Sequence, residues 1–147
     1  MRRALTRGER ALVAELFGAS VDPASVTVNA RKWWPLQPKH VVMAPDGHIW
    51  CHPKGELFRD DYSAAPLALQ SLFIHEMTHV WQHQSGINLP LRRHPFCRYR
   101  YTLTDGKPLR AYGLEQQAEI LADAFLALRG VSPPSPQSPW RDAAAGL

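Results

Sequence analysis

Two histidines and a glutamate in the segment SLFIHEMTHVWQHQSG, residues 71 to 86, have the types and spacing needed for metal chemistry. On a helix, His75 and His79 would place their Cβ atoms about 5 to 6 Å apart. Both imidazoles could then reach one zinc ion at about 2.0 to 2.1 Å. Glu76 would be rotated by roughly 100° from His75 and could accept a proton from water on the metal. The pattern predicts one zinc ion per chain and metal-assisted hydrolysis of an amide bond.

This HExxH pattern is found in zinc peptidases, and a chain of this composition would contain it by chance only about 0.01 times. A third protein ligand has to come from elsewhere. The long metzincin motif would require glycine at position 82 and histidine at position 85, where this chain has Gln82 and Ser85. His83 lies one turn further along the same helix, too far away to complete a tetrahedral site with His75. We therefore interpret His83 as a polar helix residue.

Acidic residues recur every four positions in GLEQQAEILADAFLAL, residues 113 to 128, and would share one helix face. They are Glu115, Glu119 and Asp123. The second half of this segment is apolar nearly all round, so we expect Glu119 and Asp123 to point into the protein. Buried carboxylates without partners cost several kcal/mol or take up a proton. A cation with histidine ligands on a neighbouring helix would satisfy both acids.

The succession of HEMTH and EILAD resembles the HExxH plus ExxxD pattern of the gluzincin class of metallopeptidases. The resemblance implies three metal ligands, namely His75, His79 and Glu119. It also implies that Glu76 is the general base. Asp123 would contact an imidazole that binds zinc, without binding the metal itself. Glu115 remains an alternative third ligand.

A second resemblance covers most of residues 5 to 129. The segments LTRGERALVAELFGASVDPASVTV, GHIW, FIHEMTHVWQ and YGLEQQAEILAD are similar to small zincin-like domains of bacterial Vgr-related proteins, which are associated by name with type VI secretion spikes. This similarity implies a zincin-like fold and a secretion-spike protein as a partner. It does not supply a substrate.

Several side chains could donate a hydrogen bond to the oxygen that becomes negative during amide hydrolysis. They are His94, Tyr99, Tyr101 and Tyr112. Tyr112 stands out because it lies seven residues before Glu119, near the same helix face. The basic segment from Arg92 to Arg100 could border the cleft and select acidic substrates, or could be a solvated loop. A strand such as GHIWC could pair with an extended peptide substrate.

The elements that would position these residues can be read from the chain. A capping box of Thr6 and Glu9 predicts a helix that ends at Gly18. Helices are also expected over 66–84 and 113–128, a strand over 25–30, and a hairpin that turns at Asp46 and Gly47. Residues 99–107 could form a short strand or hairpin.

These elements indicate an α+β fold, in which a short antiparallel or mixed sheet packs against the active-site helix and the glutamate-bearing helix. We expect a zincin-like metallopeptidase domain over 1–130 and a Pro-rich, flexible tail over 131–147. Between the strands, Trp33 and Trp34 are expected to anchor on the core, or alternatively to line a substrate groove.

Composition limits the remaining possibilities. The 147 residues are 45% hydrophobic and 20% charged, with a net charge of +4, which suits one globular domain. The mild, dispersed positive charge does not predict nucleic-acid binding. We find no signal peptide or membrane-inserting segment, which predicts a cytoplasmic protein as synthesised, with signal-independent export as an alternative. Cys51 and Cys97 are expected to be reduced.

Taken together, the sequence predicts a zinc metallopeptidase that acts on a peptide or protein, either as a secretion-linked effector or as a processing enzyme. The alternative is a non-catalytic zinc-binding adaptor associated with a secretion spike. Retention of Glu76 favours the peptidase, because a purely structural zinc site has no need of an acid beside its water.

Overall fold

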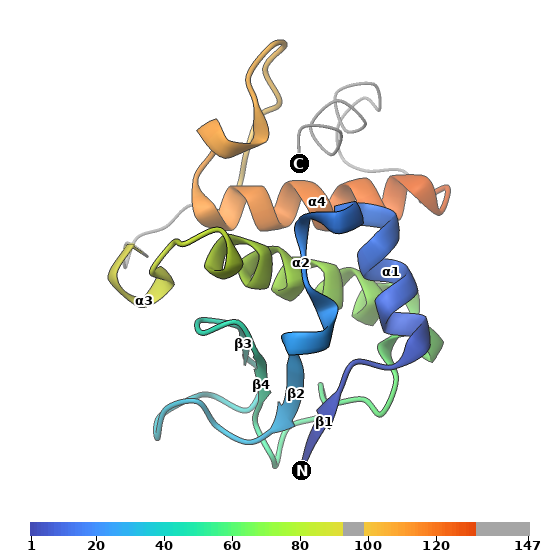
Figure 1. Cartoon of the computed structure of the whole chain (residues 1–147), viewed down its shortest axis with the longest axis vertical. Helices are drawn as coiled ribbons and strands as arrows, with labels where there is room; N and C mark the ends of the chain where they lie inside the picture. The colour runs from blue at the N-terminus through green and yellow to red at the C-terminus, as the bar shows by residue number, and fades with distance from the viewer. Residues whose placement is uncertain (93–98, 132–147) are drawn as a thin grey trace.

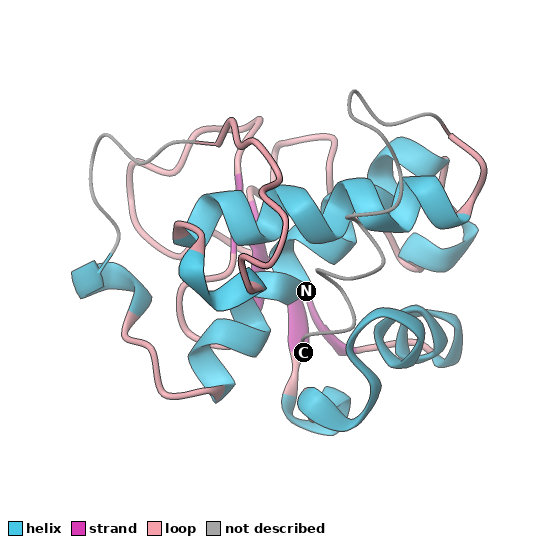
Figure 2. Cartoon of the chain, turned by 90° about the horizontal axis from the view of Figure 1, so that it is seen from above, coloured by secondary structure: helices cyan, strands magenta, loops and turns pink. Residues whose placement is uncertain are grey.

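The computed structural model describes residues 1–92 and 99–131. Its two longest helices, α2 (Leu67–Gln84) and α4 (Leu114–Leu128), pack against each other above a small sheet, and α1 (Arg7–Phe17) lies at one side (Figure 1). Figure 2 shows the same arrangement from above. The α+β prediction is confirmed, and all three predicted helices are present with ends that differ by only one or two residues.

Side-chain capping explains where α1 begins. The Thr6 hydroxyl accepts a hydrogen bond from the Glu9 backbone N–H, and the Glu9 carboxylate accepts one from the Thr6 N–H, as the sequence predicts. The Glu9 carboxylate is buried, and it also pairs with Arg3 and accepts from the Tyr62 N–H. This one side chain therefore ties together the N-terminal strand, α1 and the loop that leads to α2.

The sheet has four short strands in the order β1-β2-β4-β3: β1 (Arg2–Ala4), β2 (Thr27–Ala30), β4 (Ile49–Cys51) and β3 (Val42–Met43). Strands β2 and β4 are parallel, and the other two pairs are antiparallel. The predicted hairpin is present between β3 and β4, with Gly47 at a φ of 86° that favours glycine. The sheet is therefore mixed, as expected.

The strand predictions need three corrections. GHIWC contains β4, which is paired on both sides, so the edge beside this hairpin is β3. Residues 99–107 contain a turn but no strand, because Tyr101 and Gln116 hold this segment to α4 through side-chain hydrogen bonds. Strand β1 was not predicted, since its three residues are too few to show an alternating pattern.

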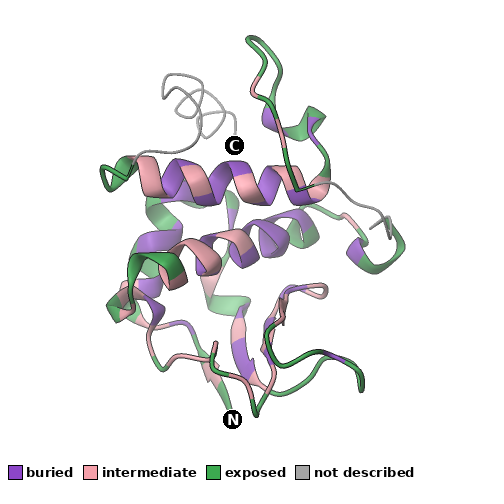
Figure 3. Cartoon of the chain, turned by 180° about the vertical axis from the view of Figure 1, so that it is seen from behind, coloured by how far each residue is buried: buried purple, intermediate pink, exposed green. Residues whose placement is uncertain are grey.

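Short helical turns occupy the connections: the 3-10 turns at Gly18–Ser20, Pro23–Ser25, Tyr62–Ala64 and Leu109–Ala111, and the four-residue helix α3 (Leu89–Arg92). Figure 3 shows that buried residues are concentrated along the helices and the strands, and they form one core cluster. Cys51 is buried there as a free thiol, which confirms its expected state, and Cys97 lies outside the described residues. The predicted tail also falls mostly outside them.

Trp33 and Trp34 do not anchor on the core. Their exposed fractions are 37% and 42%. The side chain of this loop that is buried instead is that of Gln37. No helix in the described part of the chain is long and apolar enough to cross a membrane.

Candidate metal centre

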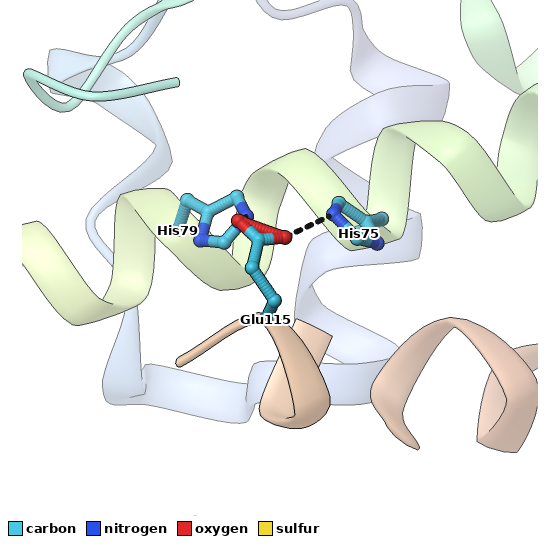
Figure 4. A group of neighbouring side chains, drawn as sticks. All are labelled: His75, His79 and Glu115. Carbon is cyan, nitrogen blue, oxygen red and sulfur yellow. Dashed lines mark ion pairs between the residues drawn. The ribbon is translucent and has the colours of Figure 1, made fainter. Parts of the chain in front are cut away.

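Helix α2 turns His75 and His79 toward the first turn of α4, where Glu115 faces both of them (Figure 4). The Glu115 Oε1 atom lies 2.9 Å from His79 Nε2, and its Oε2 atom lies 3.3 Å from His75 Nε2. One ligand atom from each residue lies within 4.8 Å of the others. All three side chains are largely buried. Two imidazoles and a carboxylate at this separation suit one divalent cation such as zinc.

A second layer of contacts fixes how the two imidazoles are turned. Glu119 Oε1 lies 3.1 Å from His75 Nδ1, on the far side of that ring from Glu115. Gln82 Oε1 lies 2.9 Å from His79 Nδ1, in the corresponding place on the second ring. Both Nε2 atoms are thereby left facing the same carboxylate. Outer contacts of this kind orient metal-binding histidines in proteins.

The tautomer of His79 follows from the hydrogen bonds of Gln82. The Gln82 amide nitrogen donates to the Leu114 carbonyl at 3.0 Å and to Gln117 Oε1 at 3.0 Å. Because a backbone carbonyl can only accept, this fixes the amide nitrogen toward Leu114 and the amide oxygen toward His79. His79 Nδ1 must therefore carry a hydrogen, and Nε2 is the atom left for a metal ion.

Electrostatics explain why a cation would be favoured here. Burial alone would lower the pKa of His75, but hydrogen bonds with Glu115 and Glu119 outweigh it and raise this pKa to about 10. The pKa of His79 is also raised, since Glu115 outweighs the effect of burial. Burial would raise the pKa of Glu115, yet the two histidines hold it well below its usual range. The negative charge of Glu115 that favours protonated imidazoles here would also favour a divalent cation between the same groups.

The carboxylates on α4 are distributed differently from the sequence-based expectation. Glu115, the alternative ligand, is the one that faces both histidines, while Glu119 contacts only the outer nitrogen of His75. Asp123 accepts a hydrogen bond from the Tyr101 hydroxyl at 2.6 Å and, among the described residues, makes none with a histidine. Burial is the main reason that the pKa of Asp123 is raised. The role of Gln82 was missed, although its place three residues after His79 puts it on the same helix face.

A cavity of about 360 Å³ opens beside the histidines, and Glu76, itself buried, lines it together with His75, His79 and Glu115. The other lining residues are mainly apolar: Trp33, Val41, Val42, Met43, Ala44, Pro45, Leu89, Pro90, Tyr99 and Leu114. The alternative prediction that a tryptophan lines a groove therefore holds for Trp33. His83 lies outside the cluster, against Gly47, where an added Cβ would come within 2.7 Å of the imidazole.

The structure also separates the candidate hydrogen-bond donors. The Tyr112 hydroxyl accepts from the Thr104 N–H at 3.0 Å, and Tyr112 does not line the cavity. Tyr99 lines the cavity, and its ring stacks on His75 with centroids 6.4 Å apart. His94 lies outside the described residues, as do Arg93 and Arg98. Arg92 and Arg100 are exposed and do not line the cavity.

The fold and site define a small α+β domain with a buried histidine–carboxylate cluster suited to a metal ion and an adjacent, mainly apolar cavity. No protein-family model matches the chain. The effector domain of Pseudomonas aeruginosa VgrG2b has a similar structure, with a TM-score of 0.78 and 38% sequence identity. The match covers 99% of this chain and 83% of that domain, so the chain belongs to the family of the VgrG2b effector domain.

The chain is also similar to a full-length protein, the type VI secretion system spike protein VgrG2b of Pseudomonas aeruginosa, with 44% identity over 134 residues. This match covers 84% of the chain but only 13% of that spike protein. The two relatives confirm the Vgr-related resemblance and link the chain to type VI secretion. The gluzincin assignment stays a prediction.

Proposed function

We propose that this chain is a zinc-dependent metallopeptidase, acting as a secretion-linked effector or processing enzyme. The observation that carries this proposal is the convergence of His75, His79 and Glu115, with Glu76 in the wall of the adjoining cavity. Nitrogen and carboxylate donors of this kind suit zinc. The effector domain to which the chain is similar belongs to a secretion spike protein, which supports a role for this chain in secretion.

For the ligands we propose His75, His79 and Glu115 in place of the set with Glu119. The support is geometric, because Glu115 reaches the Nε2 atoms of both histidines and Glu119 reaches only Nδ1 of one. Glu119 then orients His75 in the way that Gln82 orients His79. The gluzincin resemblance implies that Asp123 orients a zinc-binding histidine. In this proposal Glu119 orients that histidine instead.

A bound zinc ion would supply a Lewis acid that polarises the scissile carbonyl and lowers the pKa of a water molecule. Glu76 would accept a proton from water in the cavity and pass it to the leaving amine. Tyr99 is the better-placed candidate donor for the oxygen of the tetrahedral intermediate, since it lines the cavity and Tyr112 does not.

An extended peptide is the substrate shape that best suits the cavity. Strand β3 is at an edge of the sheet, and both of its residues, Val42 and Met43, line the cavity. A peptide could add to this edge by backbone hydrogen bonds while its side chains enter the apolar wall. Strand β4, in the segment GHIWC, is paired on both sides, so β3 is the strand that we propose for pairing with the substrate.

The second candidate function is a zinc-binding adaptor without catalysis. Structural zinc sites usually have four protein ligands, whereas three converge here among the described residues. The position of Glu76 beside an open cavity also favours catalysis over a purely structural site.

Proteome-wide cleavage profiling of the wild type and Glu76→Gln tests this proposal, with Glu56→Gln at an exposed position as the matched control. We expect about one zinc per chain in all three proteins. The wild type and the control should cut peptides, and Glu76→Gln should lose at least about 100-fold in rate. Equal activity of Glu76→Gln and wild type would refute Glu76 as the base. A zinc-loaded wild type that cuts nothing would favour the adaptor.

A further inference from the structure

Residues 31–40 form a projecting loop between β2 and β3 (Figures 1 and 3). This loop carries exposed large apolar side chains. Trp33 is 37% exposed, Trp34 is 42% exposed and Leu36 is 73% exposed. We call this segment the tryptophan loop. Leaving three such side chains in water forgoes the free energy that their burial would contribute. Their exposure within four consecutive positions of one loop suggests that they meet an apolar environment outside the chain.

The loop is ordered by its own hydrogen bonds. Gln37 is buried, and its amide nitrogen donates to the carbonyls of Val41 and Trp50 while its amide oxygen accepts from the Trp33 N–H. The Gln37 N–H in turn donates to the Trp34 carbonyl. A buried polar side chain therefore fixes the backbone in a shape that turns Trp34 and Leu36 outward. The exposure of Trp34 and Leu36 therefore follows from the hydrogen bonds that hold the loop backbone.

Lysines lie in the tryptophan loop and in the turn that packs against it. The turn 52–55 packs on the tryptophan loop so closely that a Cβ on Gly55 would clash with the Lys39 carbonyl oxygen. This contact brings Lys54 beside the loop that carries Lys39, and both are exposed. The pKa of His52 is lowered, first by desolvation and then by the positive charges of Lys32, Lys39 and Lys54, so all three lysines are close enough to act on one imidazole.

We propose that the tryptophan loop and the turn 52–55 dock on the head-group surface of a bilayer that contains anionic lipids. Tryptophan is enriched at membrane interfaces, where its apolar ring contacts lipid while its N–H group stays in contact with water. Lysines near such a surface are attracted by its negative potential. The combination of a small apolar anchor with basic residues is what reversible attachment requires.

The shape of the loop favours a membrane over a protein partner. A protein interface usually buries more than about 1,000 Å² with good complementarity, which three side chains on a projecting tip do not offer. The docking is peripheral and does not depend on the proposed peptidase activity. Because Trp33 belongs to both the loop and the cavity wall, docking would hold the cavity beside the lipid head groups.

Co-sedimentation of the 147-residue protein with phosphatidylcholine vesicles, with or without phosphatidylglycerol, tests this proposal. We expect binding only when phosphatidylglycerol is present. Lys39→Ser/Lys54→Ser should weaken it by roughly ten- to thirty-fold. The control Arg7→Ser/Arg10→Ser removes the same charge from exposed positions on α1 and should change it by less than about three-fold.

The apolar contribution is tested with Trp34→Ser/Leu36→Ser, which should weaken binding by at least about ten-fold. Leu128→Ser, at an exposed position on α4, is its control. Failure of the wild type to sediment with anionic vesicles would overturn the proposal. Binding that both control variants weaken as much as the loop variants would also overturn it, because attachment would then not involve this surface.

Discussion

Replacing Gln82 with methionine should weaken zinc binding although Gln82 is not a proposed ligand. Gln82 is fully buried and its amide makes three hydrogen bonds, to His79 Nδ1, the Leu114 carbonyl and Gln117 Oε1. Methionine has a similar length but cannot fix the tautomer of His79 or its ring orientation. Losing an outer partner of a metal-binding histidine typically costs about 10- to 100-fold in metal affinity, or about 1.4 to 2.7 kcal/mol.

The matched control is Gln117→Met. Gln117 is buried in the same chain of hydrogen bonds, where it accepts from Gln82 and donates to the Tyr112 carbonyl at 2.8 Å. Both substitutions should reduce the free energy of unfolding by about 1 to 3 kcal/mol for each buried group left unpaired. In Gln117→Met, however, Gln82 keeps its bond to Leu114 and therefore its orientation. Its zinc affinity should stay within about three-fold of wild type.

Competition with a chromophoric chelator at fixed pH measures the zinc affinity of both variants. Thermal unfolding in excess chelator measures stability separately, so that a general loss of stability is not mistaken for a specific loss of zinc binding. An unchanged zinc affinity in Gln82→Met would refute the reasoning. So would equal losses of affinity in Gln82→Met and Gln117→Met, because the effect would then come from disrupted packing between α2 and α4.

Two further predictions concern the cluster itself. Zinc binding at pH 7.5 should release at least about one proton per ion, because hydrogen bonds with Glu115 and Glu119 outweigh burial and raise the pKa of His75 to about 10. Calorimetry in buffers of different ionisation enthalpy measures this release, and a value near zero would contradict it. Glu115→Gln should lower zinc affinity by more than about 100-fold and Glu119→Gln by about 10- to 100-fold. A larger loss of zinc affinity in Glu119→Gln than in Glu115→Gln, measured by the same chelator competition, would show that Glu119 is the ligand.

Local signals in the sequence were sufficient for the helices and the hairpin. The capping box at Thr6 and Glu9 marks the start of α1, and the Asp46–Gly47 pair marks the turn before β4. These features depend on neighbours along the chain, so they can be recognised without a partner element. Strand β1 depends on its pairing with β2 across the sheet, and no local pattern announces it.

The choice among the carboxylates of α4 could not be made from periodicity. Glu115, Glu119 and Asp123 share one face of the helix, and which of them meets His75 and His79 depends on how far α4 is shifted along α2. That shift is set by packing and by the connection between the helices. The apolar character of Trp33 and Trp34 likewise predicted burial, but a buried Gln37 holds the loop instead.

The three proposed ligands come from two helices, with the whole segment 85–113 between them. A cation held by all three would cross-link the two helices and close this long loop, as a disulfide would. Unlike a disulfide, this cross-link would form only when metal is available. At a free zinc concentration 1,000 times the dissociation constant, the folded state would gain about 4 kcal/mol. The lifetime of the protein against proteases would then depend on the metal content of the compartment it reaches.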